Sequence, residues 1–339
     1  MTHVLVVGGG PIGLACAIEA RLAGHDATVI EPRSGVIDKA CGEGLMPGAV
    51  VALARLGVTP HGFPLRGVEY RDDRRAAQHR FSHGAALGVR RTTLHAALRD
   101  RAVQLGVRAV TGRVDAVEQN ADGVTAAGIQ ADWLLAADGL HSTVARVTGL
   151  HAGTPRARRR YGVRRHFAVE PWSELIEVRW TPLGELYVTP IDDGVVGIAL
   201  LAGRGVRFED ALGVAPELAA RIRGAEPRSD MRGAGPLRQR TRARTSGRVL
   251  LVGDASGYVD ALTGEGIRIG LAQARAAVEA IGRGDPSGYE AAWTEVTRDF
   301  RRLTGALVRV AASPARGLVV PLANAAPRLF GSAVERLAR

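Results

Sequence analysis

Cysteine and lysine are both scarce in this chain of 339 residues. Its two cysteines, Cys16 and Cys41, lie in unrelated contexts, so they form neither a disulfide framework nor a zinc site of the Cys-x-x-Cys kind. Lys39 is the only lysine, and the other 44 basic residues are arginines, a bias typical of a GC-rich coding sequence. The net charge of +11 is therefore weak evidence for an acidic partner. The scarcity of cysteine favours a reducing, cytoplasmic location.

Long apolar runs are missing as well. No run reaches the roughly 18 apolar residues that a membrane span needs, because arginines and prolines such as Arg309, Pro314 and Arg316 interrupt the apolar tail. The first residues lead directly into an apolar stretch, without the basic region and cleavage site of a signal peptide. We therefore expect no membrane span and no secretion signal. The apolar tail still leaves open a peripheral contact with a membrane.

The length and overall composition are those of a globular protein. At about 150 residues per domain, the chain corresponds to one large or two moderate domains. Hydrophobic residues make up 46% and charged residues 23%, close to the averages for globular proteins, which excludes a disordered or fibrous chain.

The N-terminal 31 residues have the pattern of a β-α-β unit. An apolar run at 4–7 is followed by Gly8-x-Gly10-x-x-Gly13, by a helical pattern as far as Gly24, and by an apolar stretch at 26–31. In such a unit the first glycine makes a tight turn, the second lets the backbone approach a pyrophosphate, and the third lets the helix pack on the strand. Glu31 ends the second strand, where its carboxylate can accept both hydroxyls of an adenosine ribose and would repel a 2′-phosphate. The pattern predicts a site for FAD or NAD.

Periodicity predicts the remaining elements. Helical patterns cover 48–56, 92–105, 208–223 and much of the chain after 264. Strand-like stretches are 107–118, 123–127, 133–137 and 248–252, and the last should rejoin the first sheet. Alternation of apolar and polar residues at 161–169, 174–181, 184–190 and 194–201 predicts an antiparallel sheet, and 66–89 looks like a short antiparallel excursion.

Several further motifs lie at the ends of predicted strands and helices. Asp138-Gly139-x-x-Ser142-x-x-x-Arg146 and Gly253-Asp254 each follow a buried strand, and Thr263-Gly264-Glu265-Gly266-Ile267 opens a helix. With Arg91-x-x-Leu94 and Lys39-Ala40-Cys41-Gly42-Glu43, this chain resembles the superfamily of flavoprotein aromatic hydroxylases and geranylgeranyl reductases, from residue 3 to about 275.

The resemblance implies an α/β fold in which a Rossmann-like, glutathione-reductase-type FAD domain with a parallel sheet carries an inserted antiparallel-sheet substrate domain and a helical C-terminus. The FAD domain would comprise 1–65, 88–150 and 246–285. The substrate domain would comprise 66–87 and 151–245, and 286–339 would form the C-terminal helical segment.

The resemblance also implies FAD as cofactor and NAD(P)H as a transient reductant. Asp254 would bind a ribitol hydroxyl, the N–H groups at 264–267 would stabilise reduced flavin, and Arg91 would contact the flavin or its phosphates. Asp138 with Arg146 would link the flavin domain to the nicotinamide path. Because no second Gly-x-Gly-x-x-Gly exists, NAD(P)H would dock on the surface and leave. The predicted cofactor-binding residues are Gly8, Gly10, Pro11, Ile12, Gly13, Glu31, Pro32, Lys39, Arg91, Asp138, Gly139, Gly253, Asp254, Thr263, Gly264, Glu265, Gly266 and Ile267.

The substrate pocket should lie between the flavin and the sheet of 161–201. Cys41, Glu43 and Tyr187 are its candidate residues, although Cys41 fits a small buried hydrophobe equally well. His166, Glu177 and Arg179 lie on the same strands, but alternation does not tell which of them face the cavity. Few ionic residues belong clearly to this pocket, which favours an apolar or phenolic substrate of polyketide or isoprenoid type. No catalytic side chain stands out.

Two reactions fit the resemblance. The complete Asp138 to Arg146 motif and the Arg91 element favour an NAD(P)H-dependent monooxygenase that hydroxylates a hydrophobic aromatic or polyketide-type molecule. Thr263-Gly264-Glu265-Gly266 favours the alternative, a reductase of isoprenoid carbon–carbon double bonds. A non-catalytic flavin-binding protein is a third interpretation. The chain lacks the Trp-x-Trp-x-Ile-Pro segment of flavin halogenases, which argues against halogenation.

Metal and nucleic-acid sites are not expected. His79 and His83, the only histidines four residues apart, fall in a strand-like stretch that separates them too far for one metal ion. The arginine-rich stretches 156–165 and 238–244 carry a single aromatic residue, Tyr161, and are interpreted as solvated surface. The oligomeric state stays open.

Overall fold

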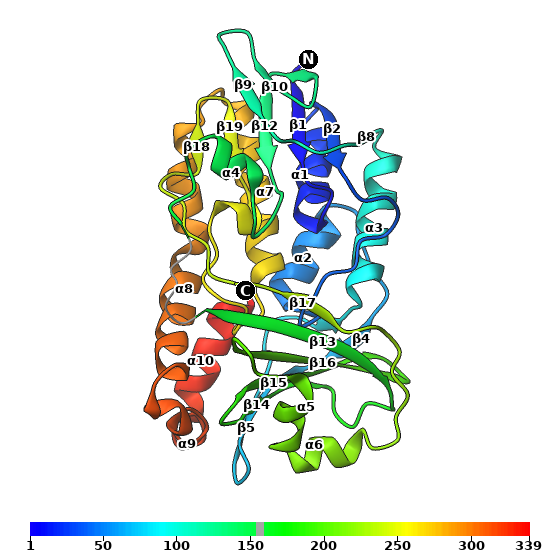
Figure 1. Cartoon of the computed structure of the whole chain (residues 1–339), viewed down its shortest axis with the longest axis vertical. Coiled ribbons are helices and arrows are strands. Elements are labelled where there is room, and N and C mark those ends of the chain that lie inside the picture. The colour runs from blue at the N-terminus through cyan, green and yellow to red at the C-terminus, as the bar shows by residue number, and fades with distance from the viewer. Residues whose placement is uncertain (154–158) are drawn as a thin grey trace.

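The computed structural model describes residues 1–153 and 159–339. Its first element, β1 (His3–Val7), is followed by α1 (Pro11–Leu22) and by β2 (Asp26–Glu31), which pairs with β1 in parallel. The predicted β-α-β unit is present because its apolar runs and glycine turn allow no other local packing. The upper body in Figure 1 is built around this unit.

A six-stranded sheet forms the centre of the upper body, in the order β18-β19-β12-β1-β2-β8. Its other strands are β8 (Arg108–Thr111), β12 (Trp133–Ala136), β18 (Thr245–Ser246) and β19 (Val249–Leu251). On one face, alternate strand residues pack against α1, α3 (Arg91–Gln104) and α7 (Gly266–Gly282). The other face is covered by β9 (Val117–Gln119), β10 (Val124–Ala126), β11 (Ile129–Ala131) and α4 (Thr143–Val147). The sheet is thus buried on both faces, as parallel sheets are.

A seven-stranded sheet forms the lower body, in the order β17-β13-β16-β15-β14-β5-β6. The strands are β5 (Gly67–Arg71), β6 (Ala76–Arg80), β13 (Arg160–Ala168), β14 (Leu175–Trp180), β15 (Gly184–Asp192), β16 (Val195–Gly203) and β17 (Arg232–Ala234). The four strands predicted over 161–201 pair antiparallel as expected, whereas β5 joins this sheet parallel to β14. The hairpin β5–β6 comes from a distant part of the chain, so no tight turn fixes its direction relative to β14.

Short helices cover the outer face of this sheet. α5 (Phe208–Gly213) and α6 (Pro216–Arg221) pack on Phe167, Leu186 and Ile198. The single helix predicted over 208–223 is therefore two helices. Pro216 begins the second one, where its missing N–H and fixed φ suit a first helical turn but not a helix interior.

The small sheet β3-β7-β4 and α2 (Pro47–Arg55) join the two bodies, through β3 (Gly44–Leu45), β4 (Phe63–Leu65) and β7 (Ala86–Gly88). After α7, the long helix α8 (Ser287–Ala311) runs from the upper to the lower body (Figure 1). The 3₁₀ turn Pro314–Leu318, α9 (Val319–Ala325) and α10 (Pro327–Ala338) then pack beside β5 and β6.

Within the described residues, no single helix has the length and apolar character to cross a membrane. Helix α8 and the segment Pro314–Ala325 meet that test only as a pair, which bends by 106°.

The predicted fold class is confirmed: an α/β body with a parallel sheet, a second sheet and a helical C-terminus are all present. The division into domains stays a prediction. β6 ends at Arg80, so His83 lies beyond it, and the expectation that both histidines share one strand is wrong.

Candidate functional site

A cavity of about 850 Å³ lies between the two bodies. One side consists of the carboxyl ends of β1, β2, β12 and β19, the usual place for ligands in an open α/β sheet. The other side consists of β5, β14, β15 and β16. All the predicted cofactor residues line this cavity except Gly13 and Glu265.

The glycine turn after β1 leaves no room for side chains at two of its three positions. A Cβ on Gly8, whose φ is +103°, would lie 2.6 Å from the carbonyl oxygen of Ala137. A Cβ on Gly13 would lie only 1.7 Å from the carbonyl oxygen of Gly8. A Cβ on Gly10 would have no neighbouring atom within 4 Å, and this glycine faces the cavity. The turn therefore needs Gly8 and Gly13 for its own packing and leaves Gly10 for a ligand.

Glu31 ends β2 with its side chain fixed. Its Oε2 accepts a hydrogen bond from the Gly9 N–H at 2.8 Å, and its Oε1 accepts one from Arg33 Nε at 2.7 Å. Burial alone would raise the pKa of Glu31, but these hydrogen bonds outweigh burial and hold the pKa below its ordinary value. The carboxylate is thus ionised at neutral pH, as a ribose-binding acid must be.

Only one carboxylate oxygen of Asp138 accepts hydrogen bonds from the first turn of α4. Its Oδ2 accepts hydrogen bonds from the N–H groups of Thr143 at 2.8 Å and Val144 at 3.1 Å. Burial raises the pKa of this carboxyl group, although the bonds from α4 favour the ionised form. Its Oδ1 is buried without a hydrogen-bond partner among the described residues. Arg146, by contrast, is exposed and bonds back to Ser142 and Thr143, outside the cavity lining.

The far end of the flavin site is the loop before α7. Asp254 lies 3.5 Å from Lys39 Nζ, and both line the cavity with Thr263, Gly264 and Ile267. Glu265 points away into the protein, where it pairs with Arg268 at 2.7 Å. Burial raises the pKa of Glu265 to about 7, despite that arginine. Residue 265 is thus not part of the cavity lining, although its neighbours Gly264 and Gly266 are.

These features fit the dinucleotide that the sequence predicts. The glycine turn, the ionised Glu31, Asp138 and the start of α7 all line one continuous cavity. A flat, long ligand with hydroxyls and phosphates at one end would satisfy this set of donors and acceptors.

The lower wall of the cavity is largely apolar. Val68, Ile176, Val178, Leu201 and Leu237 line it, and Val334 and Leu337 of α10 close it from the C-terminal side. Tyr187 also lines the cavity, and its hydroxyl donates to the carbonyl oxygen of Leu262 at 2.6 Å. Burial raises the pKa of Tyr187 well above its ordinary value, so the hydroxyl stays neutral.

The other polar candidates on these strands, Glu177, Arg179 and His166, do not line the cavity. Glu177 and Arg179 pair with each other, and Arg179 also pairs with Glu217 of α6, outside the cavity lining. His166 does not line the cavity either, but it bonds to Glu43, which does. Cys41 lines the cavity, and its Sγ accepts from the Glu43 N–H at 3.4 Å. Cys16 is buried in α1, and burial raises the pKa of its thiol.

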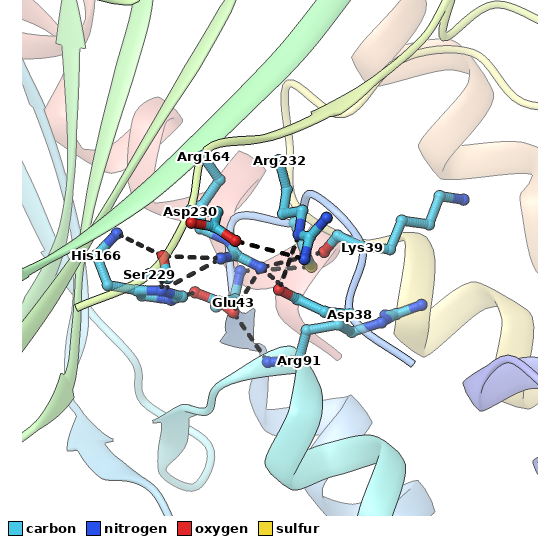
Figure 2. Close-up of polar contacts among 10 residues, drawn as sticks. Asp38, Lys39, Glu43, Arg91, Arg164, His166, Ser229, Asp230 and Arg232 are labelled. Carbon is cyan, nitrogen blue, oxygen red and sulfur yellow. Dashed lines mark hydrogen bonds and ion pairs between the residues drawn. The ribbon is translucent and has the colours of Figure 1, made fainter. Parts of the chain in front are cut away.

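Sequence reasoning missed the residues around Glu43. Asp38, Arg164 and Ser229 join Glu43 and His166 in one network of hydrogen bonds and ion pairs (Figure 2). One signal was available: Arg164 and His166 are two residues apart on a predicted strand and therefore share a face. Nothing in the sequence places Ser229 beside them.

The prediction that the arginine-rich stretches are solvated is wrong for several members. Arg164 is buried against Asp38, and Arg160 is nearly buried against Glu185 and Asp260. Arg244 pairs with Glu290 at 3.0 Å. Arg156 and Arg158 lie outside the described residues. Acids distant in the sequence neutralise these arginines, a pairing that local charge counts cannot reveal.

Comparisons with known proteins agree with this geometry. The FAD binding domain family matches residues 1–177. The menaquinone reductase of Mycolicibacterium smegmatis is 32% identical over 87% of this chain and 80% of its own length. The FAD-dependent monooxygenase OpS4 of Beauveria bassiana is also 32% identical, but over 41% of this chain and 38% of its own. The structure of p-nitrophenol 4-monooxygenase PnpA from Pseudomonas putida DLL-E4 superposes with a TM-score of 0.81 at 19% identity, over 100% of this chain and 99% of that one.

Proposed function

From the premise that this chain belongs to the FAD-binding-domain family of FAD-dependent oxidoreductases, we propose that it reduces a carbon–carbon double bond in an apolar, prenyl-type substrate. The observation that carries the proposal is the cavity itself, whose flavin-side features continue into an apolar wall with one buried acid, Glu43. A prenyl chain presents only apolar surface and double bonds, which such a wall can bind without polar partners.

The extent of similarity supports reduction over hydroxylation. The menaquinone reductase aligns with both bodies of this chain, including the sheet that forms the apolar wall. The monooxygenase OpS4 aligns with less than half of it. Because the substrate half decides which reaction a flavin enzyme performs, similarity there has the greater weight. A prenylated quinone is accordingly the substrate class to test first.

Different residues of the chain would bind the cofactor and the substrate. The turn at 8–13 and Glu31 would hold the adenosine half of FAD, and Asp254 with the start of α7 would hold the flavin half. Bound FAD would supply the two-electron chemistry, with NAD(P)H as reductant. Tyr187, fixed by its bond to Leu262, would shape the pocket floor. The apolar side chains of β5 and β14 would exclude water from the reacting carbon atoms.

Hydroxylation stays the second candidate. The sequence motif from Asp138 to Arg146 favours it. Among the described residues, no donor forms a hydrogen bond with Oδ1 of Asp138. The fold of PnpA is compatible with either reaction, because structural likeness at 19% identity concerns the fold alone.

Exclusion of oxygen separates the two reactions. We expect the FAD-loaded protein with excess NAD(P)H to convert a menaquinone to a product with two more hydrogens, at similar yield under argon and under air. Mass spectrometry of the product in an ¹⁸O₂ atmosphere should show no label. Formation of product only in air, with one ¹⁸O atom per molecule, would instead establish monooxygenation.

A prenyl substrate would reach the cavity past the C-terminal helices. Residues 300–334 contain five arginines and no acidic residue. Leu318, Leu322 and Leu329 in this segment are 54%, 64% and 73% exposed. Among the described residues, the exposed arginines Arg302 and Arg328 form no ion pair. Apolar side chains flanked by unpaired arginines suit the surface of an anionic bilayer.

We propose that this segment rests on an anionic membrane, so that α10 borders both the lipid and the cavity. Leu329 and the cavity-lining Val334 are five residues apart on that helix, about 8 Å along its axis. A prenyl lipid could therefore pass from the bilayer to the cavity along α10.

Vesicle binding tests this surface. With about 1 kcal/mol per arginine, Arg302 and Arg328 together predict a preference of at least about thirtyfold for vesicles containing phosphatidylglycerol over pure phosphatidylcholine. The double variant Leu322→Glu/Leu329→Glu should bind at least about tenfold more weakly in co-sedimentation. Val103→Glu, at an equally exposed position on α3, is the matched control and should bind like the parent. Equal binding by all three proteins would rule the surface out.

A further inference from the structure

Glu43 is held in an unusual position at the cavity wall. It is buried and has a φ of +59°, a left-handed backbone conformation that residues with a Cβ rarely adopt. Its Oε1 accepts from the Arg91 N–H at 2.9 Å, and its Oε2 lies 2.6 Å from Nε2 of His166. Strained backbone persists where surrounding contacts fix it, and it often marks a functional residue.

His166 connects Glu43 to a second polar group. Nδ1 of its ring lies 2.8 Å from the hydroxyl of Ser229 and 3.2 Å from Nη1 of Arg164. A guanidinium only donates, so Nδ1 accepts in the resting state and the single proton of the neutral ring lies on Nε2. That proton points at Oε2 of Glu43, which can accept it whether or not the carboxyl group carries its own proton. Figure 2 shows the three side chains Ser229, His166 and Glu43 in this order.

The chain of contacts runs from the surface to the cavity. Ser229 is half-buried beside the exposed Asp230, His166 is buried, and Glu43 lines the cavity. Each neighbouring pair is within hydrogen-bond distance. The charges that face Glu43 are Arg164, 3.7 Å away on β13, and the start of α3 at Arg91. Both favour a negative charge on Glu43 after it gives up a proton.

We propose that Glu43 is the acid that protonates the substrate carbon, and that His166, itself held by Ser229, positions its carboxyl group. The inference rests on the proposed reduction of a double bond. That reaction breaks one C–C π bond and forms two C–H bonds, one with hydride from the reduced cofactor and one with a proton. Glu43 supplies the proton and becomes a carboxylate. After product release, water in the cavity returns a proton to Glu43, and His166 keeps its own proton on Nε2 throughout.

Arg164, which also lines the cavity, and Asp38 complete this arrangement. Arg164 Nη2 lies 2.5 Å from Asp38 Oδ1. Asp38 thus fixes the guanidinium, which also faces Glu43. Buried ionic clusters of this kind contribute little net stability when compared with apolar packing. A structural purpose alone would therefore not account for an acid at the wall of an apolar pocket.

The isosteric variant Glu43→Gln is the direct test. We expect it to slow double-bond reduction by about 10²- to 10⁴-fold, the usual share of a general acid. Bleaching of the flavin by NAD(P)H, which needs no substrate protonation, should keep its rate. In the parent, reduction should fall as pH rises, because the acid must carry a proton, and in Glu43→Gln this alkaline limb should disappear. Glu43→Asp should recover part of the rate.

A measurement on the cofactor-free protein tests the contact separately. The imidazole ¹⁵N signals of His166, assigned with His166→Gln, should report a proton on Nε2, and Glu43→Gln should shift the Nε2 resonance. Glu177→Gln, which alters a buried acid of the same sheet away from the cavity, is the matched control and should leave both the NMR signals and the pH profile unchanged.

Two results would overturn the proposal. One is a Glu43→Gln enzyme that reduces the double bond at the parental rate with the parental pH profile. The other is an imidazole of His166 that does not respond to Glu43→Gln in the apo-protein. If the enzyme proves to be a monooxygenase but the NMR signals respond as described, the proposed function fails while the contact between Glu43 and His166 stands.

Discussion

Gly13→Ala is expected to abolish FAD retention and to destabilise the cofactor-free protein. The added Cβ would lie 1.7 Å from the Gly8 carbonyl oxygen, a backbone atom that cannot rotate away. Helix α1 must then move off β1, where Ile18 and Leu14 pack in the core. Overpacking of this kind costs about 3 kcal/mol. Because the displaced helix also carries the phosphate site at its N-terminus, we expect FAD affinity to fall more than a hundredfold.

Gly10→Ala is the matched control for that variant. Gly10 has a φ of −68°, which alanine adopts freely, and nothing lies within 4 Å of the added Cβ. The unfolding curve of the apo-protein in urea should therefore match the parent, while FAD content falls because the methyl group enters the cavity. If Gly13→Ala retains yellow colour and the parental midpoint in urea, the assignment of this turn is wrong.

The contrast between these glycines shows how much of the site the sequence could reveal. The spacing Gly8-x-Gly10-x-x-Gly13 between an apolar run and a helical pattern is local information, and strand, turn, helix and Glu31 all follow from it. The same holds for Asp254 and the start of α7, which lie at ends of predicted elements. These residues face one cavity because parallel strands place their carboxyl ends at one edge of the sheet.

Long-range pairing is what the sequence could not provide. The parallel alignment of β5 with β14 depends on how a distant hairpin meets the second sheet. The burial of Arg160 and Arg164 depends on acids up to 126 residues away, such as Asp38 for Arg164. Alternation along β13 could show that Arg164 and His166 share a face, but not that the face meets Glu43. The chemistry proposed for that acid therefore became visible only in the structure.

Arg164→Met should be the most destabilising single change in the lower body. The guanidinium is 1% exposed and faces Asp38 at 2.5 Å and Glu43 at 3.7 Å. Its loss leaves the buried Glu43 without an arginine counter-charge and leaves Asp38 with only Arg232, 3.5 Å away. Removal of one partner from a buried ionic cluster costs about 3–5 kcal/mol. We expect a loss of that size in the free energy of unfolding, measured in urea at neutral pH.

Arg165→Met distinguishes this effect from the loss of any arginine on β13. Arg165 is the next residue on the strand, points to the opposite face, and forms no ion pair among the described residues. Its replacement should change the free energy of unfolding by less than about 1 kcal/mol. In Arg164→Met, the further change Asp38→Asn should return part of the lost stability, because it removes one of the unpaired charges. An additive effect of the two changes would mean that Arg164 stabilises the fold through packing and not through its charge.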